Sequence, residues 1–242
     1  MKNSVQELTL NLEHHFNIGS NQKMQIGGEW QYYASSFNSN ETKINHPALY
    51  ITDNILLGKL SLNAGIRADL IPDDKIYLQP RFSARYTFSD ELTATASFGI
   101  YNQFLTRVPY QYRSGSYQMI WTLSDSTFLS STHFLAGLAY SRNGWLISAE
   151  AYLKKNRNQL YFVDNTIYKL DNRNTGFDLF VKKEWRKQTF FGSYSLVNTN
   201  RSEKSTGHEL KAGAIYSLRS FHFSATYIYG TGFPYIATGG HG

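Results

Sequence analysis

The sequence predicts an all-β protein, an antiparallel up-and-down transmembrane β-barrel segment of about twelve strands. Apolar and polar residues alternate with period two along most of the chain, without a convincing helical pattern. The alternating segments run about 10–12 residues, which suits a tilted strand crossing a bilayer better than a strand of a soluble protein. Short turns alternate along the chain with long polar loops, as in barrels whose long loops all lie on one side of the membrane.

The strands can be placed in order from this alternation. In the first, Leu8, Leu10 and Leu12 are separated by Thr9 and Asn11. Only the third is a more continuous apolar run, and it is the weakest prediction. The twelve expected strands cover residues 8–16, 24–32, 48–57, 60–70, 78–88, 92–103, 132–140, 145–155, 176–186, 189–198, 208–218 and 221–231.

The connections between these strands fall into two classes. The expected short turns are Gly19-Ser20-Asn21, Gly58-Lys59, Ser89-Asp90, Arg142-Asn143-Gly144, Arg186-Lys187-Gln188 and Arg219-Ser220. The expected long loops cover residues 35–46, 71–76, 104–127, 156–174 and 199–207. In an outer-membrane barrel the short turns face the periplasm and the long loops face the outside.

The two faces of the predicted sheet differ in charge. Asp53 and Lys183 are the full charges expected on the apolar face, whereas the other face carries many, among them Glu29, Arg67 and Asp69. A charge that faces lipid at mid-membrane costs about 2–4 kcal/mol, so this asymmetry favours a lipid-facing surface over a soluble sandwich. Aromatic residues gather near the expected strand ends, where they suit the headgroup level: Phe88, Tyr101, Phe104, Tyr140, Trp145, Trp185, Phe190, Tyr216, Phe221, Tyr227 and Tyr229.

Composition narrows the possible functions. Charged residues make up 17% of the chain, the mean hydropathy is −0.41, and no apolar run reaches the length of a membrane helix. Cysteine is absent, which excludes disulfides, thiolate metal sites and cysteine nucleophiles. The net charge of +6 is spread along the chain, so no nucleic-acid partner is expected. We treat residues 1–242 as one domain.

Seven segments of this pattern carry a resemblance to a known family. They are Leu78–Tyr86, Ala94–Tyr101, His133–Leu138, Ser148–Lys155, Gly176–Phe180, Gly192–Leu196 and Tyr229–Pro234. In order and spacing they resemble the C-terminal half of the barrel of TonB-dependent outer-membrane receptors, especially those of the Bacteroidetes type. The resemblance covers about residues 50–235.

The resemblance implies a role in transport. Members of this family have a barrel of about 22 strands around an N-terminal plug, and they contact the TonB complex ahead of the plug. They import siderophores, cobalamin or oligosaccharides across the outer membrane, and they are not enzymes. No plug or signal peptide is recognisable in this chain, so we expect a barrel fragment. The alternative is a passive porin-like or structural barrel of about twelve strands.

Candidate ligand-binding residues come from the polar face and one loop. Arg67, Arg81 and Arg85 are expected on that face of neighbouring strands, where they suit an anionic ligand or an acidic plug surface. They could instead pair with Asp69 and nearby glutamates. The loop side chains of Tyr110, Tyr112, Tyr117 and Trp121 suit stacking on a flat or sugar-like ligand, or packing on other loops.

The sequence gives no sign of catalysis, of a bound metal or of a cofactor. It has no nucleophile elbow, phosphate-binding loop or zinc-binding helix motif. His133, His208 and His222 lie near serines, and an outer-membrane hydrolase would need a carboxylate beside such a pair.

Overall fold

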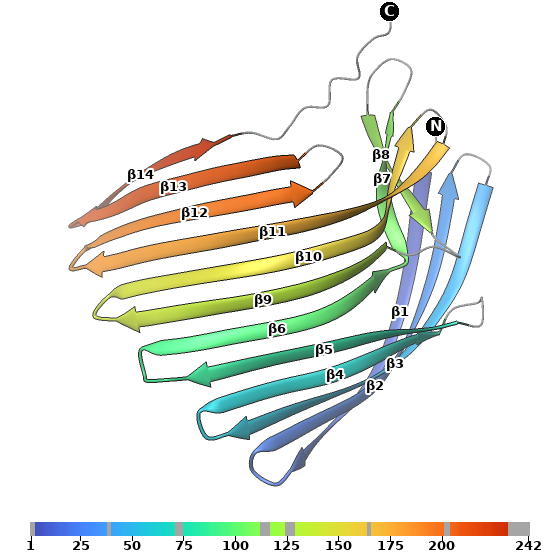
Figure 1. The fold of residues 1–242 in the computed structure, drawn as a ribbon, viewed down its shortest axis with the longest axis horizontal. Helices are drawn as coiled ribbons and strands as arrows, with labels where there is room; N and C mark the ends of the chain where they lie inside the picture. Colours follow the sequence, from blue (N-terminus) through green and yellow to red (C-terminus); the bar gives the residue numbers. More distant parts are fainter. Residues whose placement is uncertain are drawn as a thin grey trace, which may run out of the picture. The chain divides into compact units, whose positions relative to one another are not determined.

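The computed structural model describes residues 3–37, 40–70, 75–111, 117–123, 129–163, 166–200 and 204–231. These residues form fourteen strands (Figure 1), which confirms the all-β prediction. The strands are β1 Asn3–Ile18, β2 Gln22–Phe37, β3 Asn40–Leu57, β4 Leu60–Leu70, β5 Ile76–Thr87, β6 Leu92–Gln103, β7 Leu105–Gln111, β8 Tyr117–Leu123, β9 Leu129–Arg142, β10 Trp145–Val163, β11 Thr166–Trp185, β12 Gln188–Asn200, β13 Lys204–Leu218 and β14 Phe221–Gly230. No helix in the described ranges is long and apolar enough to cross a bilayer.

Twelve of the strands form one up-and-down path. Their order is β1-β2-β3-β4-β5-β6-β9-β10-β11-β12-β13-β14, so neighbours in sequence are neighbours in the sheet except around the β7–β8 hairpin. β1 and β14 stand at the two ends of this order, and the order joins no described residue of one to the other. The expected meander of about twelve strands is confirmed, because the described strands form one sheet in this order rather than two packed sheets.

The chain divides into two compact units. The first comprises residues 1–86, 95–134 and 154–172, and it contains β1–β5 and the β7–β8 hairpin. The second comprises residues 87–94, 135–153 and 173–242, and it contains β12–β14 with the turn-side halves of β9–β11.

The strand register keeps the two faces apart. In the first unit Ile26 lies opposite Ile51, which lies opposite Ile66, so one apolar row crosses β2, β3 and β4. Ile66 and Phe82 are both exposed on this face, as expected for side chains that meet lipid rather than a second sheet.

The short turns lie where the sequence predicts them. Asn143 and Gly144 both have positive φ, at 51° and 76°, which is the requirement of the two-residue turn that Asn-Gly favours. Gly58 also has positive φ. Arg186 and Arg219 adopt positive φ in their turns, although neither is a glycine.

The long loops are shorter than predicted. β2 runs to Phe37, β10 runs to Val163 and β13 begins at Lys204, so the loops expected at 35–46, 156–174 and 199–207 are largely strand. The predicted loop 104–127 contains the β7–β8 hairpin. The apolar alternation that predicts each strand stops before the strand itself ends. A hairpin outside a bilayer keeps its backbone hydrogen bonds without an apolar face.

Two of the aromatic residues predicted at the headgroup level lie elsewhere. Phe104 is buried at the base of the β7–β8 hairpin, where its ring contacts the His46 ring. Tyr101 lies on the polar face, with the Arg81 guanidinium over its ring. Spacing alone predicts a rim position for both, but Phe104 packs against His46, and Tyr101 packs against Arg81 and His133.

Aromatic rings cover glycines on the polar face. The Tyr50 ring lies across Gly27, its partner on β2, and the Tyr50 hydroxyl donates to Asn11 Oδ1 and Glu13 Oε2 at 3.0 Å. Tyr152 covers Gly176 and Phe191 covers Gly213 in the second unit in the same way. Glycine is required at these positions because an added Cβ would overlap the ring.

Gly27→Ala is therefore expected to lower the free energy of unfolding by about 1–3 kcal/mol, since it pushes the Tyr50 ring off β2 and breaks its bonds to β1. The matched control is Gly28→Ala on the opposite face, where the new Cβ would lie 3.4 Å from the flexible tip of Leu49. Denaturant unfolding of the intact protein in lipid measures both changes. Equal losses would show that the ring does not require Gly27.

Candidate functional site

Four neighbouring strands of the first unit bring polar side chains together on one face. Tyr50 of β3 lies opposite Arg67 of β4, which lies opposite Gln79 of β5. The next row on the same face lies two residues further along β4 and consists of Glu29 of β2, Ala48 of β3 and Asp69 of β4. The alternation of β-strands makes this arrangement, because residues two apart share a face.

A network of charges runs through this face. Arg67 Nη2 lies 2.6 Å from Glu29 Oε1, and Arg67 Nε lies 2.7 Å from Asp69 Oδ1. His46 Nε2 lies 3.0 Å from Asp69 Oδ1, and the Gln79 amide donates to Asp69 Oδ2. The Asp69 side chain is 0% exposed. A buried carboxylate is tolerated only when its oxygens are satisfied, and here both are.

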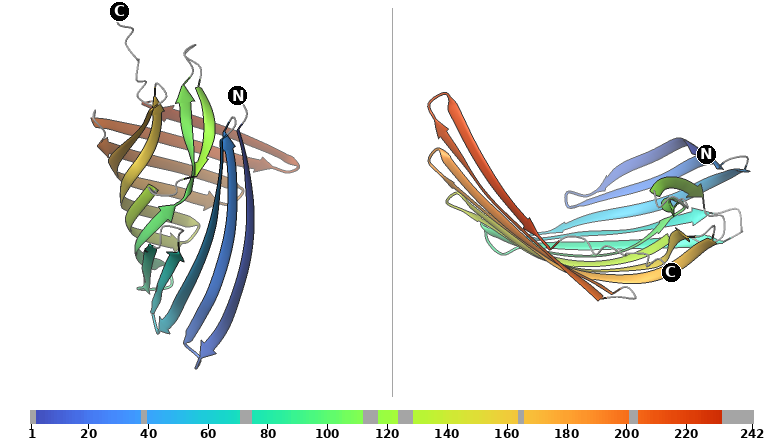
Figure 2. Two further views of the ribbon diagram at one scale, coloured as in Figure 1. Left: turned by 90° about the vertical axis from the view of Figure 1, so that its right-hand side faces the viewer. Right: turned by 90° about the horizontal axis from the view of Figure 1, so that it is seen from above.

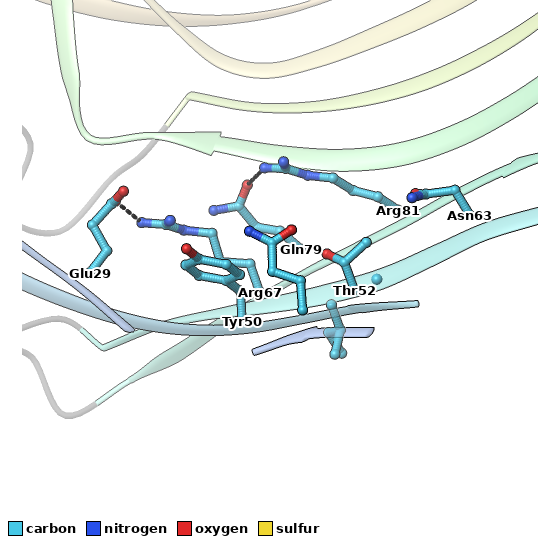
Figure 3. Close-up of a pocket in the computed structure, with 10 residues that line it drawn as sticks. Glu29, Tyr50, Thr52, Asn63, Arg67, Gln79 and Arg81 are labelled. Carbon is cyan, nitrogen blue, oxygen red and sulfur yellow. Dashed lines mark hydrogen bonds and ion pairs between the residues drawn. The ribbon is translucent and has the colours of Figure 1, made fainter. Parts of the chain in front are cut away.

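A hollow of about 330 Å³ lies beside this network (Figure 3). Its lining is mainly polar: Gln25, Glu29, Tyr50, Thr52, Asn63, Gly65, Ile66, Arg67, Gln79 and Arg81. Arg81 Nη2 donates to Gln79 Oε1 at 3.3 Å, and its guanidinium lies 4.8 Å from the centre of the Tyr101 ring. Arg81 has no carboxylate within 4 Å among the described residues, so of the two arginines that line the hollow it is the one available to an anion.

The β7–β8 hairpin covers part of the polar face. β8 contacts β1, β2 and β3 (Figures 1 and 2), and the Ser35 hydroxyl donates to the Trp121 carbonyl at 3.3 Å. At the hairpin base, the Phe104 ring centre lies 4.2 Å from that of His46 and 6.1 Å from that of Tyr77. The hairpin therefore shields the His46–Asp69 end of the charge network from solvent.

Comparison with known families decides the affiliation. The family model described as "TonB dependent receptor-like, beta-barrel" matches residues 2–240. This chain belongs to that family. The family is one of transport receptors, and no curated protein matches the chain in sequence.

Solved structures show the same fold as this TonB-dependent receptor-like barrel. The siderophore receptor PirA from Pseudomonas aeruginosa superposes with a TM-score of 0.75 at 16% identity, covering 94% of this chain and 49% of PirA. The ferric enterobactin receptor PfeA from the same organism, as the R480A mutant with enterobactin, gives 0.71 at 13%, covering 93% of this chain and 42% of PfeA. The FrpB iron transporter from Neisseria meningitidis gives 0.69 at 10%, covering 90% and 41%. The chain thus spans about half the length of these receptors.

The structure separates the predicted arginines of this receptor-like barrel. Arg67 and Arg81 line one hollow, but Arg67 is held by Glu29 and Asp69, which is the pairing alternative. Arg85 lies opposite Ser61 and is exposed, outside the hollow and without an ion pair to a described residue.

Three of the four predicted aromatic residues lie on the strands of the covering hairpin. Tyr110 is on β7, where it pairs with Gln118 and forms a bridge to Phe162 of β10. Tyr117 begins β8, and Trp121 lies further along it. Tyr112 is outside the described residues. Their role in ligand binding stays a prediction.

Several residues of the site were missed from the sequence. The expected loop 35–46 includes His46, but His46 lies on β3 opposite Gln31, which puts it on the polar face. Gln79 and Tyr50 share the alternation of the charged residues, but neither carries a full charge, so the charge pattern does not single them out. Extending the period-two pattern from 48–57 back to His46 would have found it.

The described residues show neither a metal cluster nor a complete triad. No group of three or more His, Asp or Glu side chains in the described ranges is placed to hold a metal ion. Ser131 Oγ lies 2.7 Å from His133 Nε2, and Ser217 Oγ lies 2.9 Å from His222 Nδ1. Among the described side chains neither histidine has a carboxylate partner, and His208 contacts Tyr194 instead of a serine.

Proposed function

We propose that the protein carrying this chain is an outer-membrane receptor that takes up a scarce nutrient with energy from the TonB complex. The chain would supply the C-terminal half of a barrel of about 22 strands. The chain spans only 49% of the length of PirA. The proposed uptake function is therefore a function of the whole protein and not of this chain alone. We assign TonB contact to a plug region outside the matched barrel residues. We infer that the protein is not an enzyme.

The observation that carries this proposal is the contrast between the two faces of one sheet. One face presents exposed apolar rows such as Ile26, Ile51 and Ile66, which suits contact with lipid. The other presents the charge network and the polar hollow. A polar interior inside an apolar surface is the arrangement of a barrel that conducts or binds a hydrophilic solute.

Within the hollow, Arg81 is the group we propose for ligand contact. Its guanidinium is exposed and held in place by Gln79 and the Tyr101 ring, so it offers a preorganised fork to a carboxylate or to a catecholate-type oxygen. The names of PirA and PfeA favour a siderophore over cobalamin or an oligosaccharide. The resemblance to Bacteroidetes receptors and the stacking role of the hairpin aromatics remain part of this proposal.

Uptake assays test the function directly. The intact protein is expressed in a strain lacking its own siderophore receptors, and uptake of ferric enterobactin, cobalamin and maltodextrin is measured with and without TonB. We expect uptake of one probe, lost without TonB or with a protonophore. Uptake that persists without TonB would contradict energy coupling and support the passive porin-like alternative.

Arg81→Ala is expected to weaken binding of an anionic probe about 10- to 100-fold, because it removes one charge-assisted hydrogen bond. Fluorescence quenching with ferric enterobactin measures the dissociation constant. The control is Lys211→Ala, which removes a cation of the polar face of the second unit that pairs with Glu209. An equal effect of both variants would show that net charge, not the hollow, decides affinity.

A further inference from the structure

The short turns of the second unit carry a cluster of cations. Lys183 lies near the end of β11, Arg186 and Lys187 form the turn to β12, and Arg219 lies in the turn from β13 to β14. We call these four residues the basic rim. Backbone bonds join the neighbouring turns, since Glu184 N–H donates to the Gly144 carbonyl at 2.7 Å and Ser217 N–H donates to the Lys187 carbonyl at 3.0 Å.

No carboxylate of the described residues neutralises the charge of the basic rim. The nearby Arg142 lies 3.7 Å from Glu91, and Lys182 Nζ lies 2.8 Å from Glu184. None of the four basic-rim side chains has a carboxylate within 4 Å among the described residues. Four cations at one end of a group of strands therefore remain available to an external anion.

Two of these cations are held on the apolar side of the sheet. Lys183 Nζ lies 4.8 Å from the centre of the Trp145 ring and donates to the Asn143 carbonyl at 2.8 Å. The Arg186 guanidinium lies 5.4 Å from the centre of the Trp185 ring. Both indoles are exposed, Trp145 by 42% and Trp185 by 54%. Indole rings favour the headgroup level of a bilayer, so they place these cations beside lipid headgroups rather than in the lumen.

Apolar side chains continue from the basic rim along the same face. Phe190 lies opposite Lys183 on one side and Ala214 on the other, and Phe223 lies opposite Tyr216. Phe190, Tyr216 and Phe223 are all exposed. A molecule with an anionic head and an apolar tail matches this surface, with its head at the cations and its tail along the rings.

We propose that the basic rim binds the phosphate of an anionic phospholipid, phosphatidylglycerol, in the leaflet that borders the short turns. This rests on the proposed function, because it requires the apolar face to lie in a bilayer. Guanidinium and ammonium donors each bind a phosphodiester oxygen, and the exposed indoles pack against the glycerol backbone. If the basic rim instead bound a protein or the cell wall, the protein would show no preference for anionic over neutral lipid.

Native mass spectrometry of the intact protein tests this proposal. Dioleoyl phosphatidylglycerol and dioleoyl phosphatidylcholine are titrated separately into the detergent-solubilised protein, and the apparent dissociation constants are compared. Each cation near an anionic headgroup contributes about fivefold in affinity, so the double variant Arg186→Gln/Arg219→Gln should lose about 5- to 25-fold in its preference for phosphatidylglycerol. The variant Arg186→Lys should keep most of the preference, because it retains the charge.

The matched control is Lys182→Gln/Lys211→Gln, which removes the same charge from ion-paired residues of the polar face. It should leave the lipid preference unchanged. The proposal is wrong if wild type binds both lipids equally, or if the control loses as much as the basic-rim variant. Flotation with neutral phosphatidylcholine vesicles separates the two proposals, since failure to float contradicts membrane insertion itself. A heat-modifiable gel band verifies folding of every variant.

Discussion

Asp69→Ala is expected to lower the free energy of unfolding by about 3–5 kcal/mol, the cost of leaving a buried charge without its partner. The Asp69 carboxylate accepts from Arg67 and from Gln79 and lies against His46, and it is the most deeply buried charged group among the described residues. Its removal takes one of two carboxylate partners from the half-buried Arg67, which keeps Glu29. It also leaves His46 Nε2 and the Gln79 amide without the carboxylate that they contact. Denaturant unfolding of the intact protein in phospholipid micelles measures the loss.

Glu209→Ala is the matched control for Asp69→Ala. Glu209 Oε1 lies 2.6 Å from Lys211 Nζ on the polar face of β13, but both side chains are more than 40% exposed. An exposed ion pair contributes about 0–1 kcal/mol, so this variant should be nearly as stable as wild type. If both variants lost the same free energy, solvent would have to reach Asp69, contrary to its observed burial.

Leu138→Arg is expected to destabilise the membrane-inserted protein by about 2–4 kcal/mol, provided that the residue faces the bilayer near its midplane. Leu138 lies on β9 four residues after Phe134, so the two side chains share a face. The Phe134 ring centre lies 5.0 Å from that of Phe98 on the apolar face. It is 54% exposed, so in a bilayer its surroundings are lipid. Reversible unfolding from vesicles measures the change.

Ser97→Arg introduces the same side chain one residue before Phe98. Alternation points it to the polar face, where water and other charges solvate the guanidinium, so its cost should be much smaller. The comparison isolates the direction of the side chain because the added charge is identical. Similar costs for Leu138→Arg and Ser97→Arg would refute the assignment of the two faces.

The sheet could be predicted because side-chain alternation and turn conformation both depend on residues close together in the sequence. Side chains alternate between faces, so Leu62, Ile66 and Phe82 mark the apolar face without any knowledge of distant contacts. Turns such as Asn143-Gly144 then fix the register of each hairpin, because their backbone suits only a two-residue connection. The same alternation brought Arg67 and Arg81 to one hollow.

The sequence does not show which side chains each arginine of the polar face contacts. Arg67, Arg81 and Arg85 read alike, but only the register places Glu29 and Asp69 beside the first and Tyr101 beside the second. The inward packing of the β7–β8 hairpin depends on tertiary contacts such as Phe104 with His46. The strand residues within 35–46 have no apolar pattern to reveal them, because their buried side chains include polar ones such as Ser35 and His46.

The most direct test of the central claim, that one face of this sheet meets lipid and the other a polar interior, is a cysteine scan along β4. This chain contains no cysteine, so single substitutions from Leu60 to Leu70 each add one thiol. The intact protein in vesicles is treated with a charged thiol reagent that does not enter lipid. We predict labelling at Ser61, Asn63 and Gly65 and protection at Leu62, Ala64 and Ile66, a pattern of period two. Labelling at both sets alike, or preferentially at the apolar set, would contradict the account.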